Sequence, residues 1–175
     1  MIRKYKTGDE KYIAQIYRNA IFQLASSDYT QEQLDAWAGP PVTPEKAIQR
    51  CNDKQPFVNE RDGQVVGFIE LDLDGHIDCV FVHPAYARQG VMSEIMEEIK
   101  RVAKQNNISR LYAEVSKTAR PFFEYHGFVW IKDIVVNARG VPLANYIMEY
   151  FVKAEQRASS DDAARRECPA ARSAC

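Results

Sequence analysis

The sequence lacks a long apolar segment. Although 46% of its 175 residues are hydrophobic, no run of them approaches the roughly 20 residues that a membrane-spanning helix needs. The N-terminus, MIRKYKTGDE, starts with basic residues but has no apolar stretch behind it, so it is not a secretory signal. We therefore expect a single-domain protein with no membrane partner, located in the cytoplasm.

Cysteine is scarce and unpaired. The four cysteines form no C-x-x-C pair and have no set of histidines nearby, which argues against a zinc site. We expect no bound metal, and we interpret all four as thiols in a reducing compartment without a catalytic role. They are Cys51, Cys79, Cys168 and Cys175.

Excess charge is absent too. The net charge is −1 and the basic residues alternate with acidic ones, so no basic stripe points to a nucleic-acid partner. The phosphate-binding P-loop, the G-x-G-x-x-G turn, the G-x-S-x-G elbow and the H-E-x-x-H zinc motif are all missing. A covalent route also lacks a recognisable pair of nucleophile and base.

The sequence does contain regular alternation of strand and helix patterns up to residue 153. Capping signals at Thr30 and Thr43 and an Asp62-Gly63 turn mark boundaries between them. The expected helices are Ile13–Leu24, Thr30–Trp37, Thr43–Cys51, Val91–Ala103 and a short Ala119–His126. The expected strands are Ile2–Lys6, Gln55–Glu60, Gln64–Asp74, His76–Val82, Ile108–Val115, Phe128–Val136 and Val141–Val152.

The last segment has a different composition. Residues 154–175 contain no Val, Ile, Leu, Met or aromatic residue, so they cannot bury a core face. We expect a domain over residues 1–153 followed by a disordered or loosely ordered tail.

The stretch from Val80 to Val102 carries the strongest functional signal. A β run stops at Pro84, a short turn with Gly90 follows, and an amphipathic helix begins at Val91. Free backbone N–H groups and the positive end of the helix dipole meet at such a turn, which makes it suitable for a phosphate group.

Two motifs resemble those of the GNAT superfamily of N-acetyltransferases, small bacterial members in particular. V-H-P-A-Y-A-R-Q-G-V-M is similar to the family's acetyl-coenzyme A motif V-x-P-x-Y-(R/Q)-x-x-G-x-(G/A), but Ala87 and Met92 depart from it. About thirty residues later, the segment 116–128 is similar to N-x-x-A-x-x-x-Y-x-x-x-G-F, with Ser116 and Phe123 in place of the asparagine and tyrosine. The resemblance covers nearly all of residues 1–153.

This resemblance implies an α/β (α+β) fold with a mixed, mostly antiparallel twisted sheet of about seven strands and helices on both faces. It also implies acetyl-coenzyme A as co-substrate, lying along the strand that ends at Val82, with its pyrophosphate at the N–H groups of residues 88–93. The cofactor-binding residues expected on this basis are Phe81, Val82, His83, Arg88, Gln89, Gly90, Val91, Met92, Ser93, Ser116 and Phe123.

The catalytic residues are less clearly marked. His76 and Asp78 lie two apart on the strand before the motif, where several family members place a catalytic acid or base, and histidine titrates near neutral pH. The alternative is a solvated strand end and an ion-paired carboxylate; Glu70, acting through water, is the next candidate base. Tyr125 is a candidate acid, although it lies two residues beyond the usual tyrosine position and is rotated about 200° around the helix from it; Tyr146 on the last strand is another possibility.

The resemblance implies direct attack of a primary amine on the thioester. Glu70, Asp72 and Asp74 are expected on one strand face, and Tyr29 and Trp37 come from the helical region that borders the acceptor side in this family. Acidic and aromatic groups attract cations, so a small cationic amine is favoured. A protein or peptide amine and a non-catalytic acyl-coenzyme A-binding module stay open as alternatives. The protein is expected to be a monomer or a homodimer, since the final hairpin offers a free edge.

Overall fold

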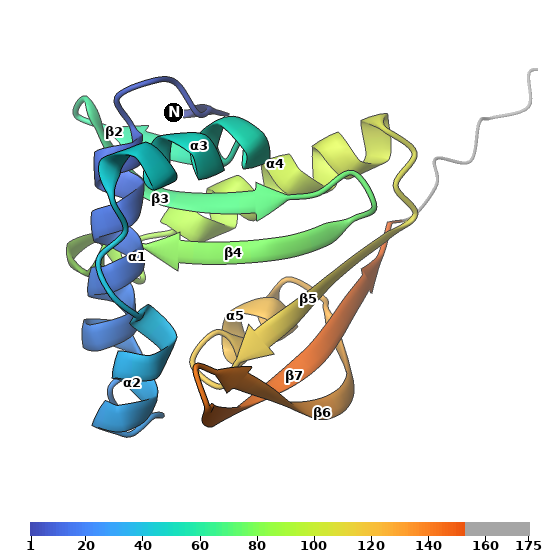
Figure 1. Ribbon diagram of the computed structural model, residues 1–175. Helices are drawn as coiled ribbons and strands as arrows, with labels where there is room; N and C mark the ends of the chain where they lie inside the picture. The colour runs from blue at the N-terminus through green and yellow to red at the C-terminus, as the bar shows by residue number, and fades with distance from the viewer. Residues whose placement is uncertain (153–175) are drawn as a thin grey trace, which may run out of the picture.

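The computed structural model describes residues 1–152, so the predicted tail, with Cys168 and Cys175, lies outside the described part. Figure 1 shows one mixed sheet with helices around it. The helices are α1 (Glu10–Leu24), α2 (Gln31–Ala38), α3 (Pro44–Lys54), a 3₁₀ turn (Pro84–Tyr86), α4 (Val91–Gln105) and α5 (Arg120–Tyr125). The strands are β1 (Ile2–Lys4), β2 (Phe57–Arg61), β3 (Gln64–Leu71), β4 (His76–Val82), β5 (Arg110–Ser116), β6 (Val129–Ala138) and β7 (Val141–Phe151).

The sheet has seven strands in the order β1-β2-β3-β4-β5-β7-β6, and only the β4–β5 pair is parallel. This confirms the predicted fold class, including the number of strands. Local signals placed several boundaries correctly, because Thr30 and Thr43 cap α2 and α3 with their hydroxyl groups. The expected strand Gln64–Asp74 was too long: β3 ends at Leu71, and Asp72 and Asp74 lie in the turn before β4.

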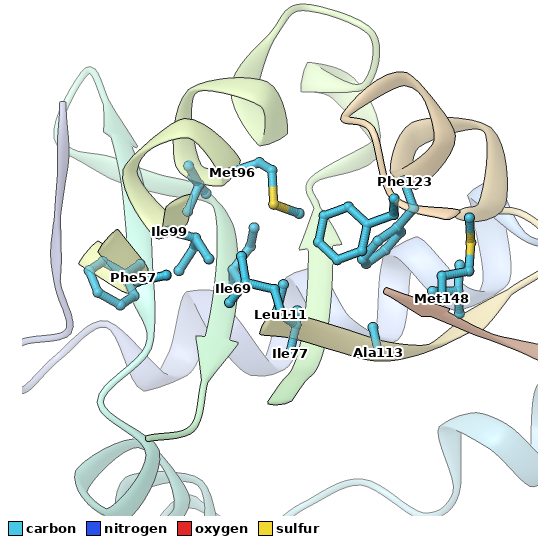
Figure 2. Close-up of a cluster of buried hydrophobic side chains, with 13 residues drawn as sticks. Phe57, Ile69, Ile77, Met96, Ile99, Leu111, Ala113, Phe123 and Met148 are labelled. Carbon is cyan, nitrogen blue, oxygen red and sulfur yellow. The ribbon is translucent and has the colours of Figure 1, made fainter. Parts of the chain in front are cut away.

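Two apolar layers enclose the sheet. Helix α4 places its apolar stripe, including Ile95, Met96 and Ile99, against one face, where Figure 2 shows it packed with Ile69 and Phe123. On the other face α1 packs against β3 and β4 through a second cluster of buried residues, and α2 packs against β7 through a third. The helices therefore cover both faces, as burial of two apolar sheet faces requires.

The central parallel pair opens like a fork. β4 and β5 are paired only at His76 with Tyr112 and at Ile77 with Ala113, and beyond these residues the two strands diverge (Figure 1). From Asp78 to Val82 the edge of β4 that faces β5 therefore has no strand beside it. Backbone N–H and C=O groups along that edge are left for another partner.

The outer edge of the sheet is β6. Its exposed side chains include Val129, Trp130, Ile131 and Val135, next to the final hairpin. A monomer or a homodimer formed through this edge stays a prediction. Among residues 1–152, none of the helices has the length and apolar character required to cross a bilayer.

Candidate active site

The turn between β4 and α4 has the geometry of an anion site. Arg88 and Gly90 both adopt positive φ, of 61° and 79°, and Gly90 is the N-cap of α4 without any capping side chain. The first N–H groups of a helix have no partner inside the helix, so those of Val91, Met92 and Ser93 are available to a ligand. A β-carbon on Gly90 would meet no atom within 4 Å, which leaves open space on the ligand side.

Met92, the departure from the family motif, turns its side chain away from this turn. It packs against the main core cluster, and its sulfur lies close to Gly67 of β3. The large residue is thus accommodated by a glycine on the neighbouring strand rather than by space near the turn.

Other polar groups hold the turn in place. His83 accepts the Ala85 N–H at 3.2 Å through Nδ1 and so caps the 3₁₀ turn, and the Gln89 amide donates to the Ala85 carbonyl at 2.8 Å. The buried His126 ring lies 3.0 Å from Ser93 Oγ through Nε2. Burial lowers the pKa of His126, with the charge of Lys100 acting in the same direction and Glu97 opposing it. His83 lies within the turn and His126 contacts the first turn of α4, so both support the candidate anion site through its shape.

The second motif lies beside the fork. Ser116 and Phe123 both line the cleft described below, and Ser116 Oγ accepts the Ala119 N–H at 3.1 Å. Phe123 is buried between Phe122 and Phe128. Tyr125 is 82% exposed and is not among the residues that line the cleft, so the geometry does not bring it to the other candidates.

A bulge gathers three side chains on one side of β4. Ile69 pairs with Val80 and Leu71 pairs with Ile77, so two steps along β3 span three along β4. The extra residue brings Asp78 and Cys79 together opposite Glu70, where simple alternation would place them on opposite faces. The ligand atoms of these three residues lie within 4.8 Å of one another.

Arg50 of α3 binds this group. Its guanidinium donates to both oxygens of Glu70, at 3.1 and 2.5 Å, and Nη2 also lies 3.1 Å from Asp78 Oδ2 and 3.4 Å from Cys79 Sγ. The charge at the centre of the three possible metal ligands is therefore a guanidinium. Lys54 adds a second cation, 3.1 Å from Asp78 Oδ2 and 2.8 Å from Asp72 Oδ2.

These contacts set the protonation states. Burial pushes the pKa of Asp78 upward, but the hydrogen bond from Lys54 and the charge of Arg50 outweigh it, so the pKa lies below its ordinary value. Burial raises the pKa of the Cys79 thiol well above its usual range, and the charge of Glu70 adds to this effect. Asp78 is thus a carboxylate at neutral pH and Cys79 a thiol. A thiol is not the nucleophilic form of cysteine, so Cys79 is not suited to attack the thioester.

His76 lies at the closed end of the fork. Its ring stacks on Tyr112, with 5.0 Å between ring centroids, and Nδ1 is 3.4 Å from Asp72 Oδ2. His76 and Asp78 both line the cleft, so the structure brings together two of the three predicted catalytic residues.

The cleft occupies about 540 Å³ between α1, α2, α3, the fork of β4 and β5, and the β6–β7 turn. Its volume is typical of a small-molecule site. Charged and polar side chains that sequence patterns did not single out also line it, namely Tyr17, Arg18, Arg50, Glu114 and Arg139. They come from four separate elements, so no spacing motif in the sequence could have grouped them.

The two aromatic residues expected on the acceptor side differ in position. Tyr29 is 5% exposed, and its hydroxyl group donates to the Ala144 carbonyl and accepts the Lys117 N–H. It is therefore a packing residue that ties α2 to β7. Trp37 lines the cleft and makes an edge contact with Tyr29.

Comparisons with known proteins agree with this geometry. The family model of the acetyltransferase (GNAT) domain matches residues 25–150. The N-acetyltransferase YafP of Escherichia coli K12 is 33% identical over 149 residues, which are 85% of this chain and 94% of that protein. A GCN5-related N-acetyltransferase from Rhodopseudomonas palustris has a TM-score of 0.81 at 29% identity, over 86% of this chain and 94% of that one.

A more distant structure shows the same fold. The PaiA N-acetyltransferase of Thermoplasma acidophilum, in complex with coenzyme A, has a TM-score of 0.67 at 19% identity, over 86% of this chain and 98% of that one. The chain belongs to the GNAT family of acetyltransferases, and it is an acetyl-coenzyme A-dependent enzyme.

Proposed function

We propose that this enzyme transfers the acetyl group of acetyl-coenzyme A to a small-molecule primary amine by direct attack in a ternary complex. The observation that carries the proposal is the fork of β4 and β5, which opens at one side onto the phosphate-binding turn and at the other onto a charged cleft. A thioester held in the fork is within reach of an amine in the cleft.

The proposed cofactor contacts follow the chain. The free edge of β4 around Phe81 and Val82 supplies N–H and C=O groups for the amides of the pantetheine arm. The backbone from Arg88 to Ser93 surrounds the pyrophosphate, and the helix dipole adds favourable potential there. Ser116 and Phe123 border the arm on the β5 side. His83 contributes indirectly, because its ring caps the 3₁₀ turn and so fixes the shape of the loop before α4.

The reaction needs one proton removed and one supplied. The acceptor is an ammonium ion at neutral pH, so a base takes its proton before the nitrogen attacks the carbonyl carbon. The C–N bond forms, the C–S bond breaks, and coenzyme A leaves as a thiolate that takes up a proton from solvent or from a side chain. A thiol of pKa about 8.5 leaves readily without a dedicated acid. Tyr125, given its exposure, has no role in this scheme.

His76 and Asp78 remain the proposed bases, with Glu70 through water as the alternative. Asp78 is ionised and lies one-third exposed at the bulge, next to the point where the strands diverge. His76, the second candidate, lies at the closed end of the fork. Glu70 is 1% exposed and is bound by Arg50, so it acts only through a relay.

A small acceptor is favoured over a protein side chain because the cleft, lined on one side by the end of α2 and the Pro40–Val42 segment, has a volume of about 540 Å³, typical of a small-molecule site. From the sequence, a cationic acceptor was predicted because Glu70, Asp72 and Asp74 were expected to be free acids on one strand face. Glu70 pairs with Arg50, Asp72 pairs with Lys54, and Asp74 accepts the Tyr112 hydroxyl at 2.6 Å. Asp78 also pairs with Arg50 and Lys54, so Glu114 is the cleft carboxylate left to attract the ammonium group without an ion-pair partner among residues 1–152.

The experiment measures release of the coenzyme A thiol from acetyl-coenzyme A across a panel of primary amines. The products are analysed for N-acetylation. Turnover that needs an amine, with both substrates bound before any product leaves, is the expected result. Binding of coenzyme A without turnover on any amine would point to the non-catalytic module instead. Turnover only on peptides would move the acceptor to the protein class.

A further inference from the structure

Two arginines at the α2 end of the cleft have no carboxylate partner. Arg18 of α1 and Arg139 of the β6–β7 turn both line the cleft, and neither forms an ion pair with an acid of residues 1–152. Arg50, on the α3 side, differs because Glu70 and Asp78 already neutralise it. No carboxylate of residues 1–152 therefore neutralises the positive charge at the α2 end.

Both arginines also bind the C-terminus of α2. Arg18 Nη1 donates to the Gly39 carbonyl at 2.9 Å, and Arg139 Nη1 donates to the Ala36 and Trp37 carbonyls at 2.6 and 3.3 Å. Gly39 permits this approach, because a β-carbon there would overlap the Arg139 guanidinium. These contacts position the side chains but engage only Nη1 of each group, and a guanidinium has five N–H donors.

The cleft carries the opposite charge along its sheet side. Asp78 is held ionised by its cationic neighbours, and Glu114 of β5 is exposed and makes no ion pair with the described part of the chain. The same small cavity thus presents the unpaired carboxylate of Glu114, beside the ion-paired Asp78, near the fork, and guanidinium groups without a carboxylate partner among residues 1–152 at the α2 end. A ligand that complements both must carry both charges.

We propose that the acceptor is a primary amine that also bears an oxyanion, a carboxylate in the simplest case, as in an amino acid. Arg18 and Arg139 bind the oxyanion through their remaining N–H groups, while the ammonium group faces Asp78 and Glu114. The inference rests on the proposed function and adds the substrate class. The oxyanion makes and breaks no bond, so the two arginines are specificity residues.

The test compares acceptors that differ in one group. Each common L-amino acid is assayed beside its carboxamide and its decarboxylated amine, and alanine is assayed beside 1-aminoethylphosphonate, which separates carboxylate from phosphonate recognition. We expect at least one amino acid to exceed both its carboxamide and its decarboxylated amine by about 10- to 100-fold in kcat/KM, the range for a charge-assisted hydrogen bond. Arg18→Gln and Arg139→Gln should each remove most of this preference, and Arg139→Lys should restore part of it.

The controls separate recognition from folding. Thermal unfolding and the KM for acetyl-coenzyme A are measured in both glutamine variants, and the readout is the ratio of kcat/KM on each acid to that on its carboxamide and its decarboxylated amine. Arg101→Gln, which removes an exposed arginine of α4 paired with Glu98, should leave the preference intact. Equal or better activity on the carboxamides and decarboxylated amines, or a preference that survives both glutamine variants, overturns the inference.

A binding measurement separates this inference from the proposed function. The same acceptors are titrated into the full chain saturated with coenzyme A, by calorimetry. Carboxylate-dependent binding that disappears in Arg18→Gln, without turnover of any amine, would retain the inference and refute the proposed catalysis. Turnover of amines without any carboxylate dependence would do the reverse.

Discussion

Gly67 of β3 lies directly against Met92 of α4: a β-carbon built on Gly67 would come within 3.0 Å of Met92 Sδ. The same β-carbon would lie 2.8 Å from Val91 Cγ1 and 3.3 Å from the Phe81 carbonyl oxygen. Gly67 therefore sets how closely the start of α4 approaches the sheet. The position of the N–H groups that we propose for the pyrophosphate depends on this contact between two segments more than twenty residues apart.

Substituting Gly67 tests that dependence. Gly67→Ala should displace the first turn of α4, lower the free energy of unfolding by about 1–3 kcal/mol as overpacking does, and weaken coenzyme A binding. Urea denaturation and calorimetry measure the two effects. The second substitution Val91→Ala, which removes the closest atom, should recover part of both losses, and an unchanged coenzyme A affinity in Gly67→Ala would contradict the idea.

Gly90 offers a matched comparison with Gly63. Both have positive φ, 79° and 75°, and neither has an atom within 4 Å of an added β-carbon, so Gly90→Glu and Gly63→Glu should lose a similar free energy of unfolding, about 1–2 kcal/mol. Only Gly90→Glu places bulk and negative charge at the phosphate-binding turn. It should weaken coenzyme A binding by about tenfold or more by calorimetry, and equal affinity in the two variants would refute the site.

The base is tested by turnover and its pH dependence. The variant that removes the true base, among His76→Ala, Asp78→Asn and Glu70→Gln, should lose roughly 10²–10⁴-fold in turnover at neutral pH. Much of this loss should return at high pH, where the amine is already neutral. If Asp78 is the base, the plot of turnover against pH should fall on its acid side only below about pH 3.9, the ordinary pKa of an aspartate, because the pKa of Asp78 is lowered.

A fall of turnover that begins near neutral pH as the pH is lowered would instead point to a histidine as the base. Glu70→Gln also leaves Arg50 without its main partner, so its thermal unfolding must be measured beside its activity. If all three variants stay within about threefold of the parent, far short of the usual effect, the base lies elsewhere.

His126 makes the fold sensitive to mild acid. Its pKa is lowered in the folded protein by burial and by Lys100, so below about pH 6.5 the unfolded chain binds a proton that the folded chain resists. Stability should be full above that pH and fall as the pH drops through it toward the folded value. Urea unfolding at about pH 7.5 and 5.5 should show this loss, and His126→Gln should reduce it.

His83→Gln serves as the comparison, because it removes a histidine from the 3₁₀ turn and leaves the His126 site intact. An equal loss of stability in the parent and in His126→Gln would show that other groups cause the acid sensitivity.

Features that depend only on neighbouring residues in the chain were predictable from the sequence. Hydroxyl groups at Thr30 and Thr43, the Asp62-Gly63 turn and the apolar stripe of α4 act over a few residues, so their patterns predicted helices and turns where they are. The Pro84 stop and the Gly90 turn act over the same range, and together with the segment 116–128 they carried the family resemblance. These features located the cofactor side of the site.

The charges of the proposed acceptor side depend on contacts between distant segments, so they could not be predicted from the sequence. Alternation along a strand predicted a free acidic face at Glu70, Asp72 and Asp74, but β3 ended earlier and the bulge in β4 added one residue to the register. Arg50 and Lys54 then neutralised those acids from α3. A bulge and an ion pair between distant segments depend on how strands and helices pack, which no local pattern encodes.

The same reason separates the arginines from the motifs. Arg18, Arg50 and Arg139 are ordinary charged residues in a sequence with a net charge of −1, and each could have been a solvated surface group. Their different partners, backbone carbonyls for two and carboxylates for the third, exist only after α1, α3 and the β6–β7 turn pack around the fork. Neighbouring residues in the sequence therefore indicated the proposed acetyl-coenzyme A turn, whereas packing between distant segments set the charges of the proposed acceptor side.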